Sequence, residues 1–314
     1  MTAPFERLAV LGLGLLGGSL AMAARQRGAA RRVVGATRRR DVLERALACG
    51  ALDEACGYEQ AVRGADLVVL ATPLAAMPEV VARIAPALAE GALVTDVGSV
   101  KGPLAETLPG LLPPGARYLG SHPMAGSHES GFEHARAELF DGSVCIVTAD
   151  PGAAGVERLA AFWSRLGARI VLREPGAHDE QVAWMSHVPH LLAFAFARAL
   201  ERAPEGSADV AGPGFRDFTR IARGDPGLWA DILTANRKSL AAPLQAVAAA
   251  LADLSRAVEA GDAGATGRSL AAARAALCRA SGPLRRATSA RRQRPGNPRP
   301  DVPAGARSDK EFDE

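Results

Sequence analysis

The sequence is poor in aromatic residues, in cysteine and in long apolar runs. Aromatic side chains make up only 4% of its 314 residues, and it contains four cysteines. No apolar run is long enough to cross a bilayer without a glycine or a charge, so we expect no membrane partner. The cysteines have no C-x-x-C or other metal-ligand spacing, so we expect reduced thiols and no metal site. They are Cys49, Cys56, Cys145 and Cys278.

The chain also has little excess of charge of either sign. Its formal net charge is +3, and charged residues make up 23% of the sequence. This balance gives no electrostatic reason to expect binding to nucleic acid. The first apolar strand pattern begins at Leu8, which leaves no room for a signal peptide, so we expect a cytoplasmic protein.

The most informative stretch is a glycine-rich turn near the start of the chain. The apolar run Leu8 to Leu11 predicts a buried parallel strand, and it leads into G-x-G-x-x-G and an alanine-rich helix. In this context the first glycine permits a tight turn, the second admits a pyrophosphate, and the third lets helix and strand pack closely. The helix N-terminus offers free N–H groups to phosphates. The predicted cofactor-binding residues of this turn are Gly12, Gly14, Leu15, Leu16 and Gly17.

The end of the next strand bears on the choice between NAD and NADP. Arg32 to Ala36 predicts a strand, and NAD-specific sites commonly place an acidic residue at its end. Here Thr37 takes that place, followed by Arg38 and Arg39. A hydroxyl and guanidinium groups attract a 2′-phosphate, which an acid would repel. The sequence therefore favours NADP, with NAD left open.

Strands and helices continue to alternate as far as residue 173. Asp66 to Ala71 predicts a strand that ends at Thr72 and Pro73, at the edge of the sheet where ligands bind, and we add these two residues to the cofactor site. The alternation predicts an α/β fold with a doubly wound parallel sheet over residues 1–173. Further strands are expected at Ala92–Thr95, Ser143–Thr148 and Arg169–Leu172, and helices at Asp41–Cys49, Met77–Leu88 and Gly155–Leu166.

A stretch rich in glycine, serine and histidine interrupts this alternation. Tyr118 to Gly131 has little periodicity, which is typical of a functional loop. It contains His122, whose backbone the following Pro123 restrains. Because histidine titrates near neutral pH, His122 could accept a proton from an alcohol.

From residue 174 the pattern becomes helical. A long apolar helix is predicted from His178 to Arg202, with a kink at Pro189. His187 and His190 are three residues apart and share a face of it. We expect a helical domain over residues 174–282, with further helices at Trp229–Leu254 and Gly267–Ala280, and a disordered tail over residues 283–314.

A dense group of charges lies in the segment GPGFRDFTRIA. Arg216, Asp217 and Arg220 alternate with Phe215 and Phe218. The apolar neighbours suggest that the charges are partly buried, and each buried charge needs a partner. A substrate carboxylate could supply that partner to Arg220 in a bidentate pair.

Five motifs occur in the order seen in prephenate and arogenate (cyclohexadienyl) dehydrogenases of tyrosine biosynthesis. They are GLGLLGGSLA, DVGSVKG, GSHPMAGS, MSHVPH and GFRDFTRIA, and the resemblance covers roughly Leu8 to Gln245. By this resemblance the chain is identified as a member of that family. The resemblance implies a Rossmann domain followed by an all-helical domain that forms most of a homodimer interface. It also implies oxidative decarboxylation of a small-molecule substrate, with hydride transfer to NAD(P).

The resemblance further implies roles for individual residues. His122 would hydrogen-bond the C4 hydroxyl of the substrate and assist its deprotonation, Ser99 would orient His122 and contact the nicotinamide or the hydroxyl, and Arg220 would hold a carboxylate. Prephenate-specific members have a glutamate where this chain has His128, so the choice between prephenate and arogenate stays open. The remaining implied substrate-binding residues are Ser186, His187, His190, Asp217 and Trp229.

Two other classes of protein remain as alternatives. A β-hydroxyacid-type dehydrogenase also pairs a Rossmann domain with a helical one, but it needs a catalytic lysine on an interdomain helix. Lys238 is the only lysine of the helical domain before the tail. A redox sensor that binds NAD(P) without turnover would have no need for Ser99, His122 and Arg220 together.

Overall fold

The computed structural model describes residues 3–127, 129–150 and 152–281 of the chain. It forms two compact units, Met1–Ala246 and Val247–Glu314. The second unit contains the end of α11 (Arg237–Glu259) and α12 (Ala263–Ser281), which includes the predicted helix Gly267–Ala280. The domain limits expected from the sequence stay a prediction. His128 and the expected tail 283–314 lie outside the described residues.

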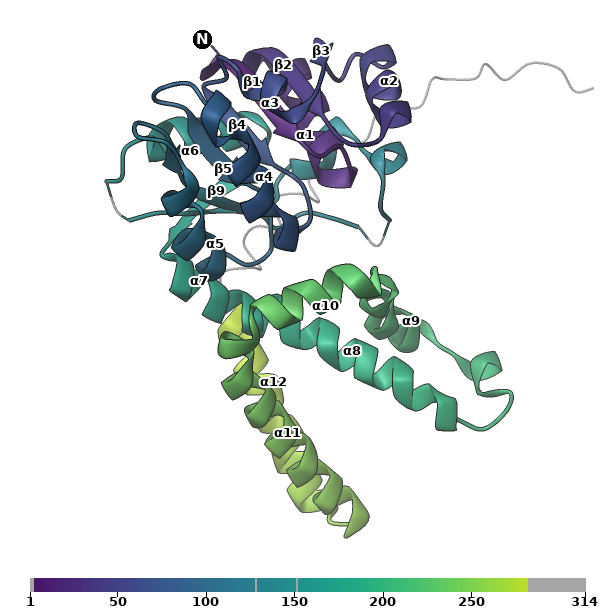
Figure 1. Ribbon diagram of the computed structural model, residues 1–314. Coiled ribbons are helices and arrows are strands. Elements are labelled where there is room, and N and C mark those ends of the chain that lie inside the picture. The colour runs from purple at the N-terminus through teal and green to yellow at the C-terminus, as the bar shows by residue number, and fades with distance from the viewer. Residues whose placement is uncertain (1–2, 128, 151, 282–314) are drawn as a thin grey trace, which may run out of the picture. The chain divides into compact units, whose positions relative to one another are not determined.

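The first unit is built on a six-stranded parallel sheet with the strand order β3-β2-β1-β4-β5-β6, seen in Figure 1. Strand β1 pairs with β2 on one side and with β4 on the other. Such an order places the switch point, where ligands bind beyond the strand ends, between β1 and β4. The predicted Rossmann-type sheet is thus confirmed. Its strands are β1 (Phe5–Leu11), β2 (Ala30–Ala36), β3 (Glu54–Ala55), β4 (Leu67–Leu70), β5 (Leu93–Asp96) and β6 (Arg117–Tyr118).

Both faces of this sheet are buried. Along β1, Leu8 and Val10 belong to one apolar cluster, whereas Ala9 and Leu11 belong to another. The first cluster includes residues of α1 (Leu15–Gln26) and α6 (Val156–Arg165), and the second includes residues of α3 (Tyr58–Val62), α4 (Met77–Ile84) and α5 (Gly102–Thr107). Burial on two faces explains why the core strands are continuous apolar runs rather than alternating ones.

The last three strands do not extend the predicted sheet but form a second, smaller one. β7 (Gly120–Pro123), β8 (Val144–Thr148) and β9 (Arg169–Arg173) form a separate three-stranded sheet, in which β7 is antiparallel to β8. The segment Tyr118–Gly131, expected to be a loop, therefore contains a strand, and His122 lies opposite Ile146. Pairing with β8 supplies backbone partners that outweigh the weak strand propensity of this glycine- and serine-rich sequence.

Several short elements were not predicted, among them β3, α3, α5 and β6. Two of these, β3 and α3, contain 2 and 5 residues, which is too short to produce a readable period. The predicted helix Asp41–Cys49 corresponds to α2 (Arg40–Ala48), and Gly50 follows it with φ +71°, a conformation that glycine adopts readily. The predicted helix Met77–Leu88 corresponds to α4 and a 3₁₀ turn, Ala85–Ala87.

The helix predicted from His178 to Arg202 is not regular. It consists of α7 (Pro175–Val182), a π-helical turn (Ala183–His187), α8 (Val188–Ala199) and a final 3₁₀ turn. Pro189 directly follows the start of α8 and has no N–H to donate to the preceding turn. A π-helical turn at this place accommodates the missing hydrogen bond.

The helix predicted from Trp229 to Leu254 is broken at Asn236. It is divided between α10 (Pro226–Ala235) and α11, and Asn236 lies at the C-terminal end of α10. The Asn236 side chain is buried and donates to the backbone oxygen of Asp179 at 2.9 Å. This tertiary contact was not visible in the helical period. Before these helices, α9 (Pro213–Thr219) is followed by a 3₁₀ turn, Arg220–Arg223.

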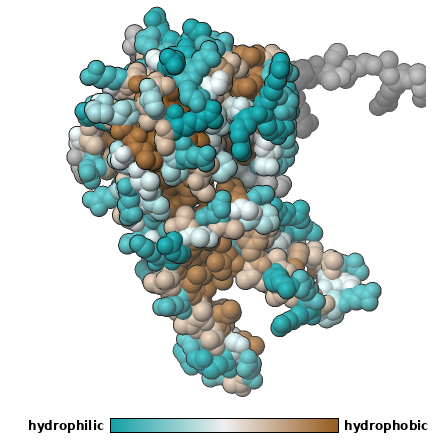
Figure 2. Space-filling view, viewed as in Figure 1, coloured by the Kyte–Doolittle hydropathy of each residue, from teal (hydrophilic) through white to brown (hydrophobic). Residues whose placement is uncertain are grey.

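Apolar surface is exposed on the helical segment of the first unit. Figure 2 shows brown, apolar surface where α8 and α10 lie. None of the helices in the described residues is long and apolar enough to cross a membrane. The four cysteines are free, as expected. The large exposed apolar side chains of this segment include Trp184, Met185, Phe196, Phe215, Phe218 and Leu228.

Candidate functional site

A cavity of about 350 Å³ lies at the carboxyl ends of β1, β2 and β4. Its lining joins the turn after β1, the loop after β2 and the loop after β4, which are distant in sequence. This is the position in which parallel sheets of this order bind a dinucleotide. The predicted cofactor residues that line it are Gly12, Gly14, Thr37, Arg38, Arg39, Thr72 and Pro73.

The three glycines of the turn have different surroundings. Gly12 has φ +101°, a conformation that L side chains rarely adopt. A Cβ atom on Gly17 would overlap the backbone oxygen of Gly12, whereas a Cβ on Gly14 would meet no atom within 4 Å. Gly12 and Gly17 are thus required by the fold of the turn. The free space beside Gly14 is the space that an approaching pyrophosphate needs.

The cavity also contains an unsatisfied hydroxyl. The Oγ1 atom of Thr72 is buried and, within the described residues, has no hydrogen-bond partner. Arg39 is paired with Asp41 at 2.7 Å, whereas Arg38 makes no salt bridge in the part of the chain that the structure describes. An orphan hydroxyl and an exposed guanidinium beside the cavity fit a polar, phosphate-bearing ligand.

Leu15, Leu16 and Gly17 do not line this cavity. Leu15 and Leu16 begin α1 and pack into the apolar core. Their possible contribution to binding is through backbone N–H groups, because the first N–H groups of a helix have no partner within it.

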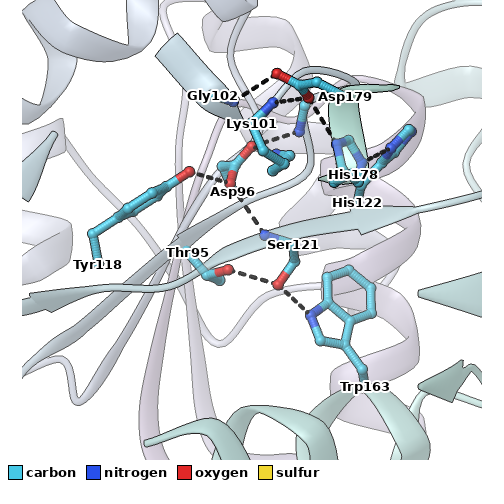
Figure 3. A network of polar contacts seen from close by, with 11 residues as sticks. Thr95, Asp96, Lys101, Gly102, Tyr118, Ser121, His122, Trp163, His178 and Asp179 are labelled. Carbon is cyan, nitrogen blue, oxygen red and sulfur yellow. Dashed lines mark hydrogen bonds and ion pairs between the residues drawn. The ribbon is translucent and has the colours of Figure 1, made fainter. Parts of the chain in front are cut away.

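His122 lies on β7, which packs against β5 of the main sheet. Its side chain is buried, and its Nδ1 atom is 2.8 Å from Nε2 of His178 on α7. The Nδ1 atom of His178 is in turn 2.8 Å from Oδ1 of Asp179. Figure 3 shows these three side chains in a continuous chain of contacts. Residues 56 positions apart in the sequence are thus brought together.

Asp179 also fixes the start of α5. Its two carboxylate oxygens accept hydrogen bonds from the backbone N–H groups of Lys101 and Gly102, each at 2.8 Å. The first residues of a helix present N–H groups that lack partners, and a carboxylate satisfies them well. One carboxylate therefore holds both the loop after β5 and the imidazole of His178.

A second buried carboxylate, Asp96, lies beside this group (Figure 3). It forms a fully buried ion pair with Lys101. It also accepts hydrogen bonds from the Tyr118 hydroxyl at 2.9 Å and from the Ser121 backbone at 3.2 Å. Burial lowers the pKa of Lys101 and raises that of Tyr118. The partners of the Asp96 carboxylate offset the cost of burying its charge, and removing one of them would lower the stability of the fold.

The histidines of the site are held in the neutral form. Burial lowers the pKa of His122 well below its ordinary value, and the charges of His178, Lys101 and His187 act in the same direction. Burial also lowers the pKa of His178, although Asp179 opposes this shift. A neutral imidazole near pH 7 has a free lone pair and can serve as a base.

The helical segment contributes two more histidines. His187 is buried, and burial lowers its pKa to about 4. Its Nδ1 atom accepts a hydrogen bond from Asn236 at 3.0 Å, so the proton is on Nε2, which is buried and has no partner among the described residues. His190 stacks on Trp229 with ring centroids 3.8 Å apart. Its Nδ1 atom donates to the backbone oxygen of Ser186 at 2.8 Å.

The charge group of GPGFRDFTRIA is exposed, which corrects the expectation of partial burial. Arg216, Asp217 and Arg220 all lie on the surface of the first unit. The reason is that Phe215 and Phe218 turn towards Phe196 of α8 and leave the charges on the outer face. Arg220 is near enough to His190 to lower its pKa, after the larger effect of burial.

The structure therefore brings some predicted residues together and leaves others apart. His122, His187, His190, Trp229 and Arg220 are linked by contacts or by electrostatic influence on one another. Ser99 is half-buried in the loop after β5, and the described residues show no hydrogen bond between it and His122. The partner of His122 Nδ1 is His178 instead.

Sequence reasoning did not identify several members of this site. The expected motif DVGSVKG contains Asp96 and Lys101, but no local signal shows that the two form a buried pair. The adjacent His178 and Asp179 were read only as the start of a helix. The surrounding residues, which include Glu174, Glu180 and Gln181, gave no signal that these two side chains would be buried. Lys238, which the alternative β-hydroxyacid reaction would require, is exposed.

Comparison with protein families gives two matches that together cover most of the chain. Residues 20–172 match the family described as prephenate dehydrogenase, nucleotide-binding domain. Residues 174–271 match the family described as prephenate dehydrogenase, dimerization domain.

Within the described residues no group of three histidine, cysteine, aspartate or glutamate side chains could hold a metal ion.

Individual proteins give the same result. The chain is 35% identical over 243 residues to the cyclohexadienyl dehydrogenase of Zymomonas mobilis, covering 75% of this chain and 83% of that protein. A crystal structure of prephenate dehydrogenase from Aquifex aeolicus with hydroxyphenyl propionate and NAD+ matches with a TM-score of 0.78 and 28% identity, covering 87% of this chain and 98% of that one. The arogenate dehydrogenase of Synechocystis matches with a TM-score of 0.72 and 29% identity, covering 89% and 98%.

Proposed function

Because this chain belongs to the prephenate dehydrogenase family, we propose that it oxidatively decarboxylates prephenate, arogenate or both, with hydride transfer to NAD(P). The observation that carries the proposal is a buried, neutral imidazole, His122, on a strand packed against the sheet whose edge forms the dinucleotide cavity. The products would be 4-hydroxyphenylpyruvate from prephenate and tyrosine from arogenate.

In the proposed reaction the protein forms no covalent bond to the substrate. Loss of the C1 carboxylate as carbon dioxide makes the substrate ring aromatic, so much of the driving force lies in the substrate. When bound, the nicotinamide accepts the hydride from C4 of the substrate ring. His122 accepts the proton of the C4 hydroxyl as the C–O bond gains double-bond character. The electron pair left by carbon dioxide moves through the ring to this oxygen, and His122 returns the proton to form the phenol.

The helical segment supplies the substrate-binding groups in this proposal. Arg220, an exposed guanidinium near His190, binds a substrate carboxylate in a bidentate pair. Among the described residues the buried Nε2–H of His187 has no partner, and a substrate oxygen would satisfy it. The other proposed pocket residues are Ser99, His128, Ser186, His190, Asp217 and Trp229.

We also propose that the protein prefers NADP to NAD. Thr37 and Arg38 line the cavity at the end of β2, where a ribose 2′-group is bound in sheets of this kind. Neither carries a negative charge, and Arg38 has no salt-bridge partner within the described residues. Both features support binding of a 2′-phosphate.

We propose that the protein is a cytoplasmic homodimer. A dimerization-domain match covers residues 174–271. The exposed aromatic side chains Phe196, Phe215 and Phe218 lie within this range and are of the kind that dimer interfaces bury. Sedimentation of the purified chain tests this assembly directly.

The decisive experiment is a two-by-two assay of the purified protein. Prephenate or arogenate is mixed with NAD or NADP, and the absorbance of the reduced cofactor is followed. We expect reduction with at least one substrate and faster reduction with NADP. Binding of cofactor without turnover of either substrate would support a redox sensor instead. A separate assay with a β-hydroxyacid tests the other alternative, which turnover of that substrate alone would support.

A further inference from the structure

His122 is the end of a chain of three hydrogen-bonded groups. Asp179 Oδ1 is 2.8 Å from His178 Nδ1, and His178 Nε2 is 2.8 Å from His122 Nδ1. All three side chains are buried. Figure 3 shows the three side chains in this order, two of them from α7 and the third, His122, from strand β7.

The direction of each hydrogen bond follows from the carboxylate at one end. An ionised carboxylate has no proton to donate, and Asp179 already accepts from the N–H groups of Lys101 and Gly102. His178 Nδ1 must therefore donate to it. A neutral imidazole with its proton on Nδ1 has a lone pair on Nε2, so His178 accepts from His122 Nδ1. The remaining nitrogen of His122, Nε2, then carries the lone pair.

We propose that Asp179 and His178 are positioning residues that fix His122 in the tautomer with its proton on Nδ1 and its lone pair on Nε2. This inference deepens the proposed function and rests on it for the role of His122 as the base. Nε2 takes the proton of the C4 hydroxyl, and Nδ1–H continues to donate to His178. When the substrate oxygen regains electrons, Nε2 gives the same proton back. The Nδ1 protons of His122 and His178 stay in their hydrogen bonds throughout, and no proton is passed on to Asp179.

The charges around His122 agree with this arrangement. The groups that face it are His178 from α7, Lys101 from the loop before α5 and His187 from the π-helical turn, and a proton on any of them opposes a positive charge on His122. Burial lowers the pKa of both His122 and His178. Both rings are thus neutral near pH 7. The hydrogen bond between His122 Nδ1 and His178 Nε2 requires this, because only one of these two nitrogens can carry a proton.

The tautomer can be measured without any activity. The full-length protein is labelled with ¹⁵N-histidine, and ring-nitrogen shifts are recorded without substrate near pH 7. Among the six histidines, His122 is assigned from the signals lost in His122→Asn. We expect a protonated Nδ1 and an unprotonated Nε2. A protonated Nε2 in the wild-type protein would overturn the proposal even if the enzyme were active.

Two variants of His178 separate positioning from packing. In His178→Gln the amide can accept from His122 Nδ1 and donate to Asp179, whereas in His178→Phe the ring volume is kept and the acceptor is lost. We expect kcat to fall about 10- to 100-fold in His178→Phe, with the substrate KM and the cofactor Kd unchanged, and most of it to return in His178→Gln. Equal losses in the two folded variants would indicate packing alone.

Asp179→Asn gives a second route to the same answer. An amide NH₂ in place of one carboxylate oxygen cannot accept from all three N–H groups, so the tautomers of His178 and His122 lose their anchor. We expect mixed His122 tautomers in the nitrogen spectrum and a lower kcat, with thermal melting as the check on folding. Unchanged tautomers in the folded variant would contradict the proposal. If the wild-type protein turned over neither substrate, the proposed function would fail, and the nitrogen spectra would still judge the tautomer.

Discussion

The dinucleotide cavity and the histidine cluster of this protein are built in opposite ways. The cavity is open space at the ends of three strands, lined by glycines and by polar and apolar side chains, and it leaves the Thr72 hydroxyl without a partner in the described residues. The cluster around His122 is formed by buried side chains that bond one another. A site that must admit and release a large ligand needs open space. A catalytic imidazole that must keep one orientation is instead held by hydrogen bonds to the ring nitrogen that does not react.

The largest effect should come from the cluster. We expect His122→Asn to fold and to bind cofactor but to lose about 10²- to 10⁴-fold in kcat, because the proton acceptor is removed. Steady-state kinetics and cofactor titration measure the two properties separately. His134→Asn is the matched control, since His134 is partly exposed and lies in a surface turn. A His122→Asn enzyme with near wild-type turnover would remove the proposed base.

The glycine turn gives the next effect and separates ligand space from fold. We expect Gly14→Ala to keep the melting temperature of the wild-type protein but to weaken cofactor binding at least tenfold, because its Cβ would occupy open space that the pyrophosphate requires. Gly17→Ala should lower the melting temperature, because its Cβ would overlap the backbone of Gly12. Thermal melting and cofactor titration of both variants test the contrast. It would fail if Gly14→Ala bound cofactor normally.

Arg38 should produce a smaller and selective effect. Loss of one charge-assisted hydrogen bond to a 2′-phosphate costs roughly 1.5 to 3 kcal/mol, so we expect Arg38→Ala to weaken NADP about tenfold or more and NAD hardly at all. Arg40→Ala is the control, because Arg40 pairs with Glu44 and does not line the cavity. Equal losses for both cofactors would refute a 2′-phosphate contact.

The last effect concerns the pH dependence of stability and leaves the activity comparison untouched. His187 has a pKa of about 4 in the folded protein, against an ordinary value of 6.5. The unfolded chain therefore binds more protons than the native one below about pH 6.5, and stability should fall as the pH decreases towards 4, by up to about 3 kcal/mol from this residue. Urea unfolding between about pH 7 and pH 5 measures the slope. His187→Gln should flatten it, and His134→Gln should not. A slope that survived His187→Gln would have to come from the other buried histidines.

The same contrast explains what could be predicted from the sequence. The cavity depends on local features: an apolar strand, three glycines and a helix within a few residues of one another. Its strands and its place at the sheet edge were therefore predictable, and the sheet order confirms them. Short elements such as β3 and the separate sheet containing β7 were missed, because their existence depends on pairing partners rather than on their own period.

The cluster around His122 depends on contacts between distant segments. His122 could be singled out because it lies in a polar, aperiodic stretch and histidine titrates near neutral pH, but its partner His178 is 56 positions away. Asp179 contacts Lys101 and Gly102 across 78 and 77 positions. Nothing in the helical period of residues 175–182 shows which backbone groups a carboxylate will meet. Only tertiary structure could reveal those pairs.

The position of Asp179 has a consequence for engineering hybrids. Its carboxylate belongs to the segment that matches the dimerization domain, yet its backbone partners belong to the segment that matches the nucleotide-binding domain. A chimaera joined at residue 173 would take His122 from one parent, and His178 and Asp179 from the other. Recombination with a relative should therefore place the crossover after Asp179, so that His122, His178 and the carboxylate that supports them come from one parent.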